Sequence, residues 1–325
     1  MRAIIPVAGI GSRLKPHTYS IPKVLLNVGG KPILGHILDK LLEENITKAT
    51  FIIGHLGEMI RDYVMSEYPE VESSFVEQES MEGLGHAIYT AIPTFDEKEI
   101  FIILGDTVFE VDLKNVFKNK VSSLGVKSVT DPRRFGVAVM ENGYIKKLIE
   151  KPQTPVSNLA LVGLYYISDS AALVSCLNQL VKNDLRTKGE LQLTDALQIM
   201  IDSGGKITTF PVEGWYDCGK PETLLSTNQH LLDHKSSCKV YPNVVINEPV
   251  FIADDVEIEN SVIGPYATID KKSKITDCII KNSIIGSNAI VNMSLLENSI
   301  IGNNSIIRGT FRRLNSGDSS EIDFY

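Results

Sequence analysis

The first 23 residues combine two glycines and two cations in a pattern typical of an anion-binding loop. An apolar run leads into the loop Gly9-Ile10-Gly11-Ser12, which is followed by Arg13 and, further on, by Lys23. Without a Cβ, backbone N–H groups can approach a phosphate closely, and the two cations can neutralise its oxygens. The loop lacks the Gly-Lys-Ser/Thr of a P-loop, and Leu14 stands where a dinucleotide-binding loop has its third glycine. A tight turn between a strand and a helix, with solvated cations, is the alternative.

Two aspartates far apart in the sequence are candidate metal ligands. Asp106 follows the apolar run Ile100–Leu104, and Asp217 follows Trp215 and Tyr216. A carboxylate at the end of a buried strand is costly unless it faces a cleft and binds a cation or a donor. Two carboxylates favour Mg²⁺ over Zn²⁺. Taken singly, each aspartate is also compatible with a helix N-cap or a turn.

Two further segments place candidate binding residues at the end of a strand and before a helix. Glu150 and Lys151 end an expected strand, because Pro152 stops it. Gln78 and Gly83 lie in a glycine-containing segment that leads into an expected helix and could lie against a flat base. As an isolated tripeptide, Glu-Lys-Pro is also compatible with a solvated turn.

The elements that must position these residues alternate between strands and helices up to about residue 235. The pattern predicts a parallel sheet covered by helices, with ligands at the carboxyl ends of its strands. From residue 125 the pattern shifts to antiparallel strands. We expect strands over 3–5, 49–53, 74–76, 100–104, 135–140, 145–149, 160–167 and 207–212, and helices over 33–42, 58–68, 85–92, 171–181, 194–203 and 222–234. Thr194 is expected to cap its helix.

The last part of the chain has a different residue pattern. Aliphatic residues recur about every six positions, and the phrase Asn-Ser-Val/Ile-Ile-Gly begins at Asn260, Asn282 and Asn298. This repeat predicts a parallel β-helix, in which each coil stacks on the last; a small β-sandwich is the alternative. We expect a first domain over 1–235 and the β-helix over 236–325, with the tail 309–325 forming a terminal cap or a partner strand.

The composition restricts the partners. The 325 residues carry a formal charge of −8, and 43% of them are hydrophobic. This balance argues against nucleic acid or an anionic membrane as the main partner. The sequence has no apolar run of membrane-spanning length, and its four cysteines form no Cys-x-x-Cys. We expect a cytoplasmic homo-oligomer.

Taken in order, these motifs resemble the sugar-1-phosphate nucleotidylyltransferases, or nucleoside-diphosphate-sugar pyrophosphorylases. The opening of that family, L-A-G-G-x-G-T-R-L-x-P-x-T followed by P-K, is matched by residues 6–18 and 22–23. Its L-G-D, E-K-P, G-x-Y, G-E-L-x-x-T-D and W-x-D-x-G motifs are matched at residues 104–106, 150–152, 163–165, 189–195 and 215–219. The resemblance implies a Rossmann-like mixed α/β sheet followed by a left-handed β-helix.

The resemblance also implies a reaction and roles for the residues. A sugar 1-phosphate attacks the α-phosphorus of a nucleoside triphosphate, and pyrophosphate leaves with Mg²⁺ as cofactor. Such a transfer depends on positioning and charge neutralisation. The implied roles are metal binding by Asp106 and Asp217; contact with the β/γ-phosphates by Arg13 and with the α-phosphate region by Lys23; nucleotide binding by Ala8, Gly9, Gly11, Ser12, Gln78 and Gly83; and binding of the sugar phosphate by Gly136, Glu150, Lys151 and Tyr165.

The base and two other classes of function stay open. Ala8-Gly9 is closer to the P-A-A-G of uridylyltransferases, so UTP is the alternative to dTTP, which we favour with glucose 1-phosphate. A β-helix that also transfers acyl groups is disfavoured, because such acyltransferases usually rely on a catalytic histidine and none follows His234. A non-catalytic regulatory subunit would be expected to lose a cation or a metal carboxylate, yet Arg13, Lys23, Asp106 and Asp217 are all present.

Overall fold

The computed structural model describes residues 1–233 and 241–309, and these form two compact units. The sheet unit consists of Met1–Asn27 and Lys31–Thr227, and the coil unit takes in Val28–Gly30 and the chain from Asn228 onward. The predicted domain boundary at residue 235 and nearly all of the predicted cap or partner strand lie outside the described residues. Within the described ranges, no helix is both long enough and apolar enough to cross a bilayer.

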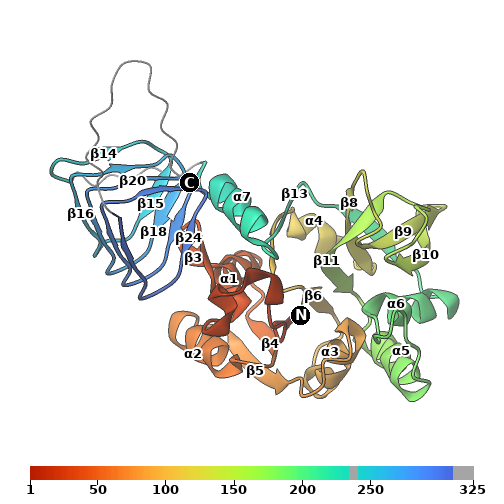
Figure 1. The fold of residues 1–325 in the computed structure, drawn as a ribbon. Helices are drawn as coiled ribbons and strands as arrows, with labels where there is room; N and C mark the ends of the chain where they lie inside the picture. Colours follow the sequence, from red (N-terminus) through yellow and green to blue (C-terminus); the bar gives the residue numbers. More distant parts are fainter. Residues whose placement is uncertain (234–240, 310–325) are drawn as a thin grey trace. The chain divides into compact units, whose positions relative to one another are not determined.

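The sheet unit is built on one mixed sheet in the order β10-β9-β11-β6-β1-β4-β5, with β8 beside β11 and β12 beside β8 (Figure 1). The strands β1, β4, β5 and β6 run parallel, and β11 joins β6 antiparallel. The strands are β1 Arg2–Pro6, β4 Lys48–Ile53, β5 Glu72–Glu77, β6 Ile100–Ile103, β8 Ser123–Ser128, β9 Gly136–Glu141, β10 Tyr144–Glu150, β11 Leu159–Ile167 and β12 Thr208–Pro211. The predicted parallel centre and antiparallel continuation are confirmed.

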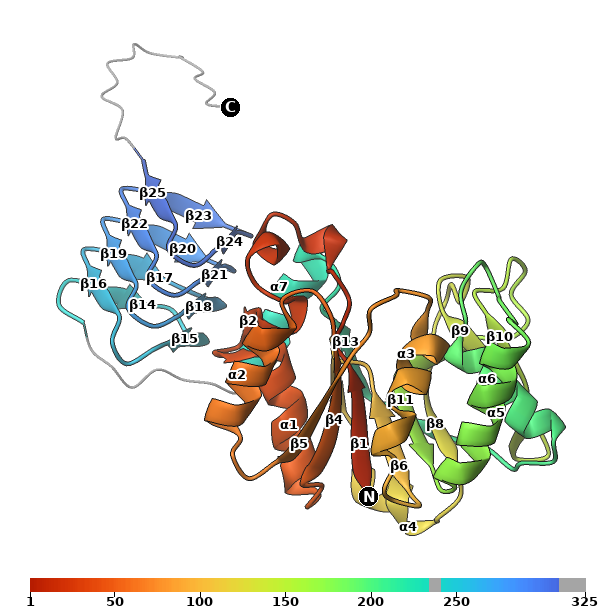
Figure 2. The same ribbon diagram turned by 90° about the horizontal axis from the view of Figure 1, so that it is seen from below.

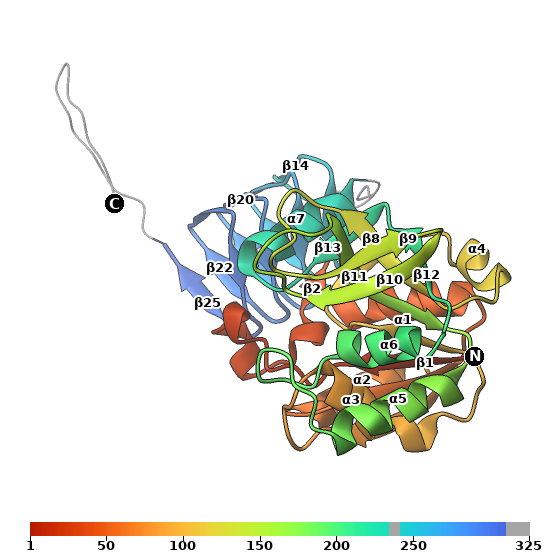
Figure 3. The same cartoon turned by 90° about the vertical axis from the view of Figure 1, so that its right-hand side faces the viewer.

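Seven α-helices are described: six lie close to the predicted positions, and the one over Leu113–Lys118 was not predicted. They are α1 Ile33–Glu43, α2 Gly57–Glu67, α3 Leu84–Thr90, α4 Leu113–Lys118, α5 Ser170–Lys182, α6 Leu193–Asp202 and α7 Pro221–Leu232. In α1 the buried residues recur at helical spacing, which is why this segment packs as a helix. Figure 3 shows α3, α5 and α6 grouped together beside the strands β9 to β11. One detail was wrong: α6 begins at Leu193, so Thr194 lies inside its first turn and is not the cap.

The coil unit consists of three parallel sheets (Figure 2). Along the chain, successive short strands join the first, the second and the third sheet in turn. The first sheet holds β14 Val245–Ile246, β17 Val262–Ile263, β20 Ile279–Lys281 and β23 Leu295–Glu297; the second holds β15 Val250–Ile252, β18 Ala267–Ile269, β21 Ile284–Ile285 and β24 Ile300–Ile301; the third holds β16 Glu257–Glu259, β19 Lys274–Thr276, β22 Ile290–Asn292 and β25 Ile306–Arg308. Aliphatic side chains fill the space between the sheets. The predicted fold class, a Rossmann-like mixed sheet followed by a left-handed β-helix, is confirmed.

The repeated asparagines lie at turns between strands of the β-helix. Asn260, Asn282 and Asn298 have φ values of 47°, 42° and 50°. Asparagine visits this left-handed region more readily than most residues with a Cβ. The amide of Asn282 also donates to Asn298 Oδ1 at 2.5 Å, which links one coil to the next. The Asn-Ser-x-Ile-Gly phrase is therefore the turn signal of the coil.

The coil unit also contains a turn from early in the chain. The fully buried Asn228, in α7, accepts hydrogen bonds from Gly29 N at 2.9 Å and from Thr268 Oγ1 at 2.6 Å, and donates to Tyr266 O at 3.2 Å. Gly30 has a φ of 89°, and a Cβ there would lie 2.5 Å from the ring of Phe251. The turn therefore requires glycine for two independent reasons.

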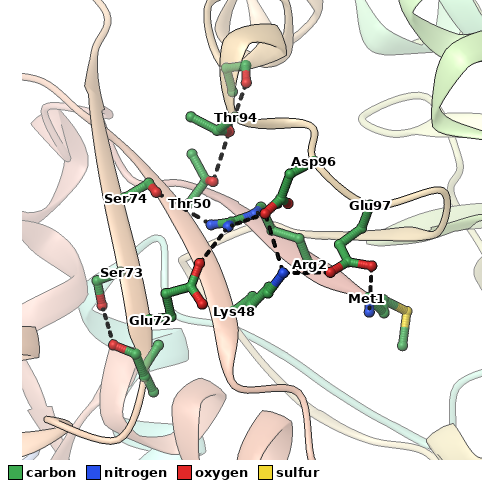
Figure 4. A network of polar contacts seen from close by, with 12 residues as sticks. Met1, Arg2, Lys48, Thr50, Glu72, Ser73, Ser74, Thr94, Asp96 and Glu97 are labelled. Carbon is green, nitrogen blue, oxygen red and sulfur yellow. Dashed lines mark hydrogen bonds and ion pairs between the residues drawn. The ribbon is translucent and has the colours of Figure 1, made fainter.

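At the start of β1, Arg2 is the centre of a polar network at the edge of the sheet (Figure 4). Its side chain is 4% exposed, and its Nε and Nη2 lie 2.7 and 2.9 Å from the two Asp96 oxygens. Nη2 also lies 3.0 Å from Glu72 of β5. Lys48 of β4 contacts Asp96 and Glu97 at 3.3 and 2.6 Å. The network ties three parallel strands to the segment that precedes β6.

This network predicts an acid-sensitive contribution to stability. The hydrogen bonds from Arg2 hold the pKa of Asp96 well below its usual value, and Lys48 adds to the effect. A lowered folded-state pKa gives stability that is present above the unfolded pKa of about 3.9 and is lost as the pH falls below it. We expect Asp96→Asn to lower the unfolding free energy by about 1 kcal/mol at pH 7, since solvent screens the half-exposed carboxylate, and to flatten the loss below pH 4.

Denaturant unfolding at pH 7 and pH 3 measures both effects. Asp62→Asn, at an exposed position of α2, is the matched control. An Asp96→Asn variant with the same acid dependence as the parent protein would contradict the prediction.

Candidate active site

A short antiparallel ribbon brings the two predicted metal ligands together. Strand β7 (Thr107–Glu110) starts directly after Asp106, and β13 (Gly214–Asp217) ends at Asp217. The two strands pair so that Asp217 lies opposite Thr107, and Cys218 N donates to Asp106 O at 3.0 Å. The carboxylates therefore come from neighbouring positions of two paired strands, although they are far apart in the sequence.

Asp106 and Asp217 line one cavity together with most of the predicted sugar-side residues. The cavity has a volume of about 210 Å³. Its walls are formed by Leu84, Leu104, Asp106, Thr107, Arg134, Phe135, Gly136, Glu150, Leu161, Val162, Gly163, Tyr165, Gln192, Leu193, Thr194, Trp215 and Asp217. A larger cavity, of about 520 Å³, is lined by α4 and β12 and contains none of the predicted residues.

The predicted sugar-binding side of the cavity is formed by paired strand ends. Glu150 and Gly136 are register partners at the ends of β10 and β9, and a Cβ on Gly136 would lie 2.9 Å from Glu150 Oε2. Thr194 Oγ1 donates to the same oxygen at 3.2 Å. Burial, with a further contribution from the Glu150 charge, raises the pKa of Tyr165, so its hydroxyl stays protonated as a donor. These groups offer acceptors and donors suited to sugar hydroxyls.

The glycine loop lies close to the two predicted cations. Gly11 has a φ of 67°, and a Cβ there would lie 3.0 Å from Lys23 Cβ. Lys23, whose side chain is 10% exposed, places Nζ 2.5 Å from Asp106 Oδ2. A Cβ on Gly219 would lie 2.7 Å from both Arg13 Nη2 and Asp217 Oδ1. Each cation thus lies beside one of the two carboxylates.

The remaining predicted nucleotide residues lie outside the cavity lining. Ala8 is buried against Gly54, whereas Gly9 and Ser12 are exposed. Gln78 is buried, and its amide donates to Gly83 O at 3.4 Å.

The segment around Gly83 is fixed by a second loop. Leu191 N donates to Glu82 O, and Gly85 N donates to Leu191 O, both at 2.8 Å. Arg186 bridges the two loops through Glu82 Oε2 at 2.5 Å. Glycine at position 85 follows from this contact, because a Cβ there would lie 2.8 Å from Leu191 O.

Lys151 is the predicted sugar-phosphate residue that the structure leaves outside the cavity. It is exposed, and its Nζ lies 3.4 Å from Glu150 Oε1. Sequence reasoning did not single out Arg134, Thr107 or Gln192, and assigned no role to Trp215. Trp215 and Gln192 do lie within matched motifs, each two positions before a residue named in the predictions, Asp217 and Thr194. That proximity in the sequence was the signal that could have identified them.

The residues present fit a magnesium site completed by substrate. Mg²⁺ is commonly held by one or two carboxylates together with substrate phosphates and water. Asp106 and Asp217 supply two carboxylates in one cavity. Among the described residues, no group of three or more His, Cys, Asp and Glu side chains could hold a metal alone. When bound, Mg²⁺ would neutralise charge that develops on phosphate oxygens.

Comparison with known proteins shows the family. The model of the family described as nucleotidyl transferase matches residues 2–234. The chain belongs to the nucleotidyl transferase family. It is 32% identical over 326 residues to the low-salt glycan biosynthesis nucleotidyltransferase Agl11 of Haloferax volcanii, covering 90% of each chain. It is 33% identical over 240 residues to the UTP–glucose-1-phosphate uridylyltransferase AglF of the same organism, covering 71% of this chain and 96% of AglF.

Two other similarities bear on length and fold. The bifunctional protein GlmU of Methanocaldococcus jannaschii is 36% identical over 259 residues, which cover 78% of this chain and 60% of that protein. A solved structure from Bacillus anthracis, provisionally called a glucose-1-phosphate thymidylyltransferase, is 29% identical with a TM-score of 0.62, covering 73% of this chain and 97% of that one. Together the comparisons support nucleotidyl transfer to a sugar 1-phosphate as the general activity.

Proposed function

We propose that the protein transfers a thymidylyl group from dTTP to glucose 1-phosphate, with Mg²⁺ as cofactor. A phosphate oxygen of the sugar 1-phosphate forms a bond to the α-phosphorus of the triphosphate. The bond between the α-phosphorus and the bridging oxygen breaks, and pyrophosphate leaves with that oxygen and its electron pair. The products are dTDP-glucose and pyrophosphate.

One observation carries this proposal: a single cavity is lined by Asp106, Asp217 and Glu150. The strand ends bearing Gly136 and Glu150 orient the sugar, while the two aspartates lie where the phosphates must meet. Lys23 and Arg13, beside those aspartates, supply positive charge for the α-phosphate and the leaving pyrophosphate. No nucleophilic side chain is required. Burial raises the pKa of the neighbouring Cys218 thiol to about 12, which keeps it neutral.

A second candidate replaces dTTP with UTP. The similarity to AglF, whose name gives UTP and glucose 1-phosphate, favours it. The similarity to the Bacillus anthracis protein favours dTTP. The two nucleotides differ at the 5-methyl group and the 2′-hydroxyl.

A pyrophosphate-release panel tests both candidates. We expect dTTP with glucose 1-phosphate to be the best pair among dTTP, UTP, CTP, GTP and ATP, combined with the 1-phosphates of glucose, galactose, mannose and N-acetylglucosamine. Adding dUTP and 5-methyl-UTP separates the methyl group from the hydroxyl. A best rate with UTP would establish the second candidate, and no release with any pair would overturn the proposed function.

A further inference from the structure

Two adjacent arginines differ sharply in their contacts. Arg133 and Arg134 occupy the centre of a turn in which Phe135 N donates to Pro132 O at 3.0 Å. The Arg133 guanidinium makes two parallel hydrogen bonds to Asp131, both of 2.8 Å. Arg134 instead lines the cavity, and within the described part of the chain it makes no hydrogen bond or ion pair. The turn thus fixes one arginine and leaves the other available at the cavity.

The charge around the cavity shows why that availability matters. Three carboxylates line it, those of Asp106, Glu150 and Asp217, and Arg134 is the only cation in the described lining. Lys23 is not part of the lining and is paired with Asp106. A sugar 1-phosphate carries up to two negative charges, and a guanidinium in the same wall would offset part of the repulsion from the carboxylates.

We propose that Arg134 binds the phosphate group of the sugar 1-phosphate. This assignment rests on the proposed function and adds to it a binding residue outside the Glu-Lys-Pro motif. A guanidinium presents two donors in a planar fork that matches phosphate oxygens. Arg134 lies two positions before Gly136, which is the register partner of Glu150. One short segment would therefore contact both the phosphate and the hydroxyl groups of the same sugar.

Steady-state pyrophosphate release by variants tests the assignment. We expect Arg134→Gln to raise the KM for glucose 1-phosphate about 10-fold or more, which is the loss of a charge-assisted hydrogen bond. The KM for the nucleoside triphosphate should change less than about twofold, and Arg134→Lys should recover part of the loss. Arg133→Gln, with the same change of charge one residue away, is the matched control and should leave both constants unchanged.

Calorimetric titration of the full chain separates this assignment from the proposed function. With glucose 1-phosphate and with inorganic phosphate as probes, Arg134→Gln should bind about 10-fold more weakly than the parent protein, and Arg133→Gln equally well. This result would support Arg134 even if no nucleotide yields pyrophosphate. Equal affinities in all three proteins, no binding by the parent protein, or a higher KM for the triphosphate instead of the sugar phosphate would overturn the assignment.

Binding can also be followed optically. Trp215 is the single tryptophan of the chain and lies in the same cavity wall, with its ring centroid 4.9 Å from that of Phe135. Its fluorescence should respond to glucose 1-phosphate at about 10-fold higher concentration in Arg134→Gln than in Arg133→Gln. Identical titration curves for the two variants would contradict the assignment.

Discussion

Asp217→Asn should reduce pyrophosphate release about a thousandfold, because a divalent cation at a phosphoryl-transfer centre contributes several kcal/mol of charge stabilisation. Asparagine keeps the shape of the side chain but lowers the charge available to the metal. Asp217 forms no ion pair among the described residues, so the substitution leaves no buried cation without a partner. The loss should therefore appear in turnover and in the Mg²⁺ concentration required, with little change in stability.

Asp106→Asn is expected to be equally inactive but less stable. Asp106 accepts a hydrogen bond from Lys23 Nζ at 2.5 Å, and the lysine side chain is nine-tenths buried. Removing the charge of one partner leaves the buried ammonium without its counter-charge, which is destabilising. The two variants thus separate the proposed metal binding from ion pairing within the same site.

Asp112→Asn is the matched control for both variants. Asp112 caps α4 by accepting from Asn115 N at 3.2 Å, and asparagine caps a helix about as well as aspartate. The control should retain full activity and the parent unfolding midpoint. Full activity in Asp217→Asn, at the Mg²⁺ concentration that saturates the parent protein, would remove Asp217 from the metal site.

The sequence indicated which residues belong to the site, but it did not indicate which strands bring those residues together. Asp106 was expected at the carboxyl end of a buried strand, and it does follow β6 closely. What the sequence pattern could not show is that β7 and β13 pair with Asp217 opposite Thr107. Short strands have no periodicity strong enough to reveal a partner, and their register is a long-range property of the folded chain.

The β-helix, in contrast, was predictable because its sequence does contain a repeat. Its turn phrase repeats because the corners between strands need residues that accept a positive φ. Asn260 meets that need before a strand of the first sheet, and Asn282 and Asn298 meet it before strands of the second. The turn at Val28–Gly30 carries no such repeat. Its place in the coil unit depends on the buried Asn228, whose partners are distant in the sequence. Arg134 was likewise indistinguishable from Arg133 until the Asp131 contacts separated them.

Arg13→Ala should lower kcat about a hundredfold or more while changing the KM for the sugar 1-phosphate by less than about threefold. Arg13 Nη2 lies beside Asp217 and Gly219, close to where the proposed metal site would bind the triphosphate. Its contact would strengthen as charge moves onto the leaving pyrophosphate, and an interaction that grows in the transition state appears in kcat. The neighbouring cation offers a control, because Lys15 is exposed with its Nζ 4.9 Å from the centre of the Tyr19 ring, and Lys15→Ala should be nearly silent.

The reverse reaction supplies a sharper test of the same role. With the nucleotide sugar and pyrophosphate as substrates, Arg13→Ala should raise the KM for pyrophosphate, and Arg13→Lys should recover only part of the activity, since an ammonium cannot reproduce the two-pronged contact. A variant that loses affinity for the sugar 1-phosphate while keeping its turnover would place Arg13 on the acceptor side. In that case Arg13 and Arg134 would both bind the phosphate of the sugar 1-phosphate, and Lys23 would act on the triphosphate together with the proposed metal ion.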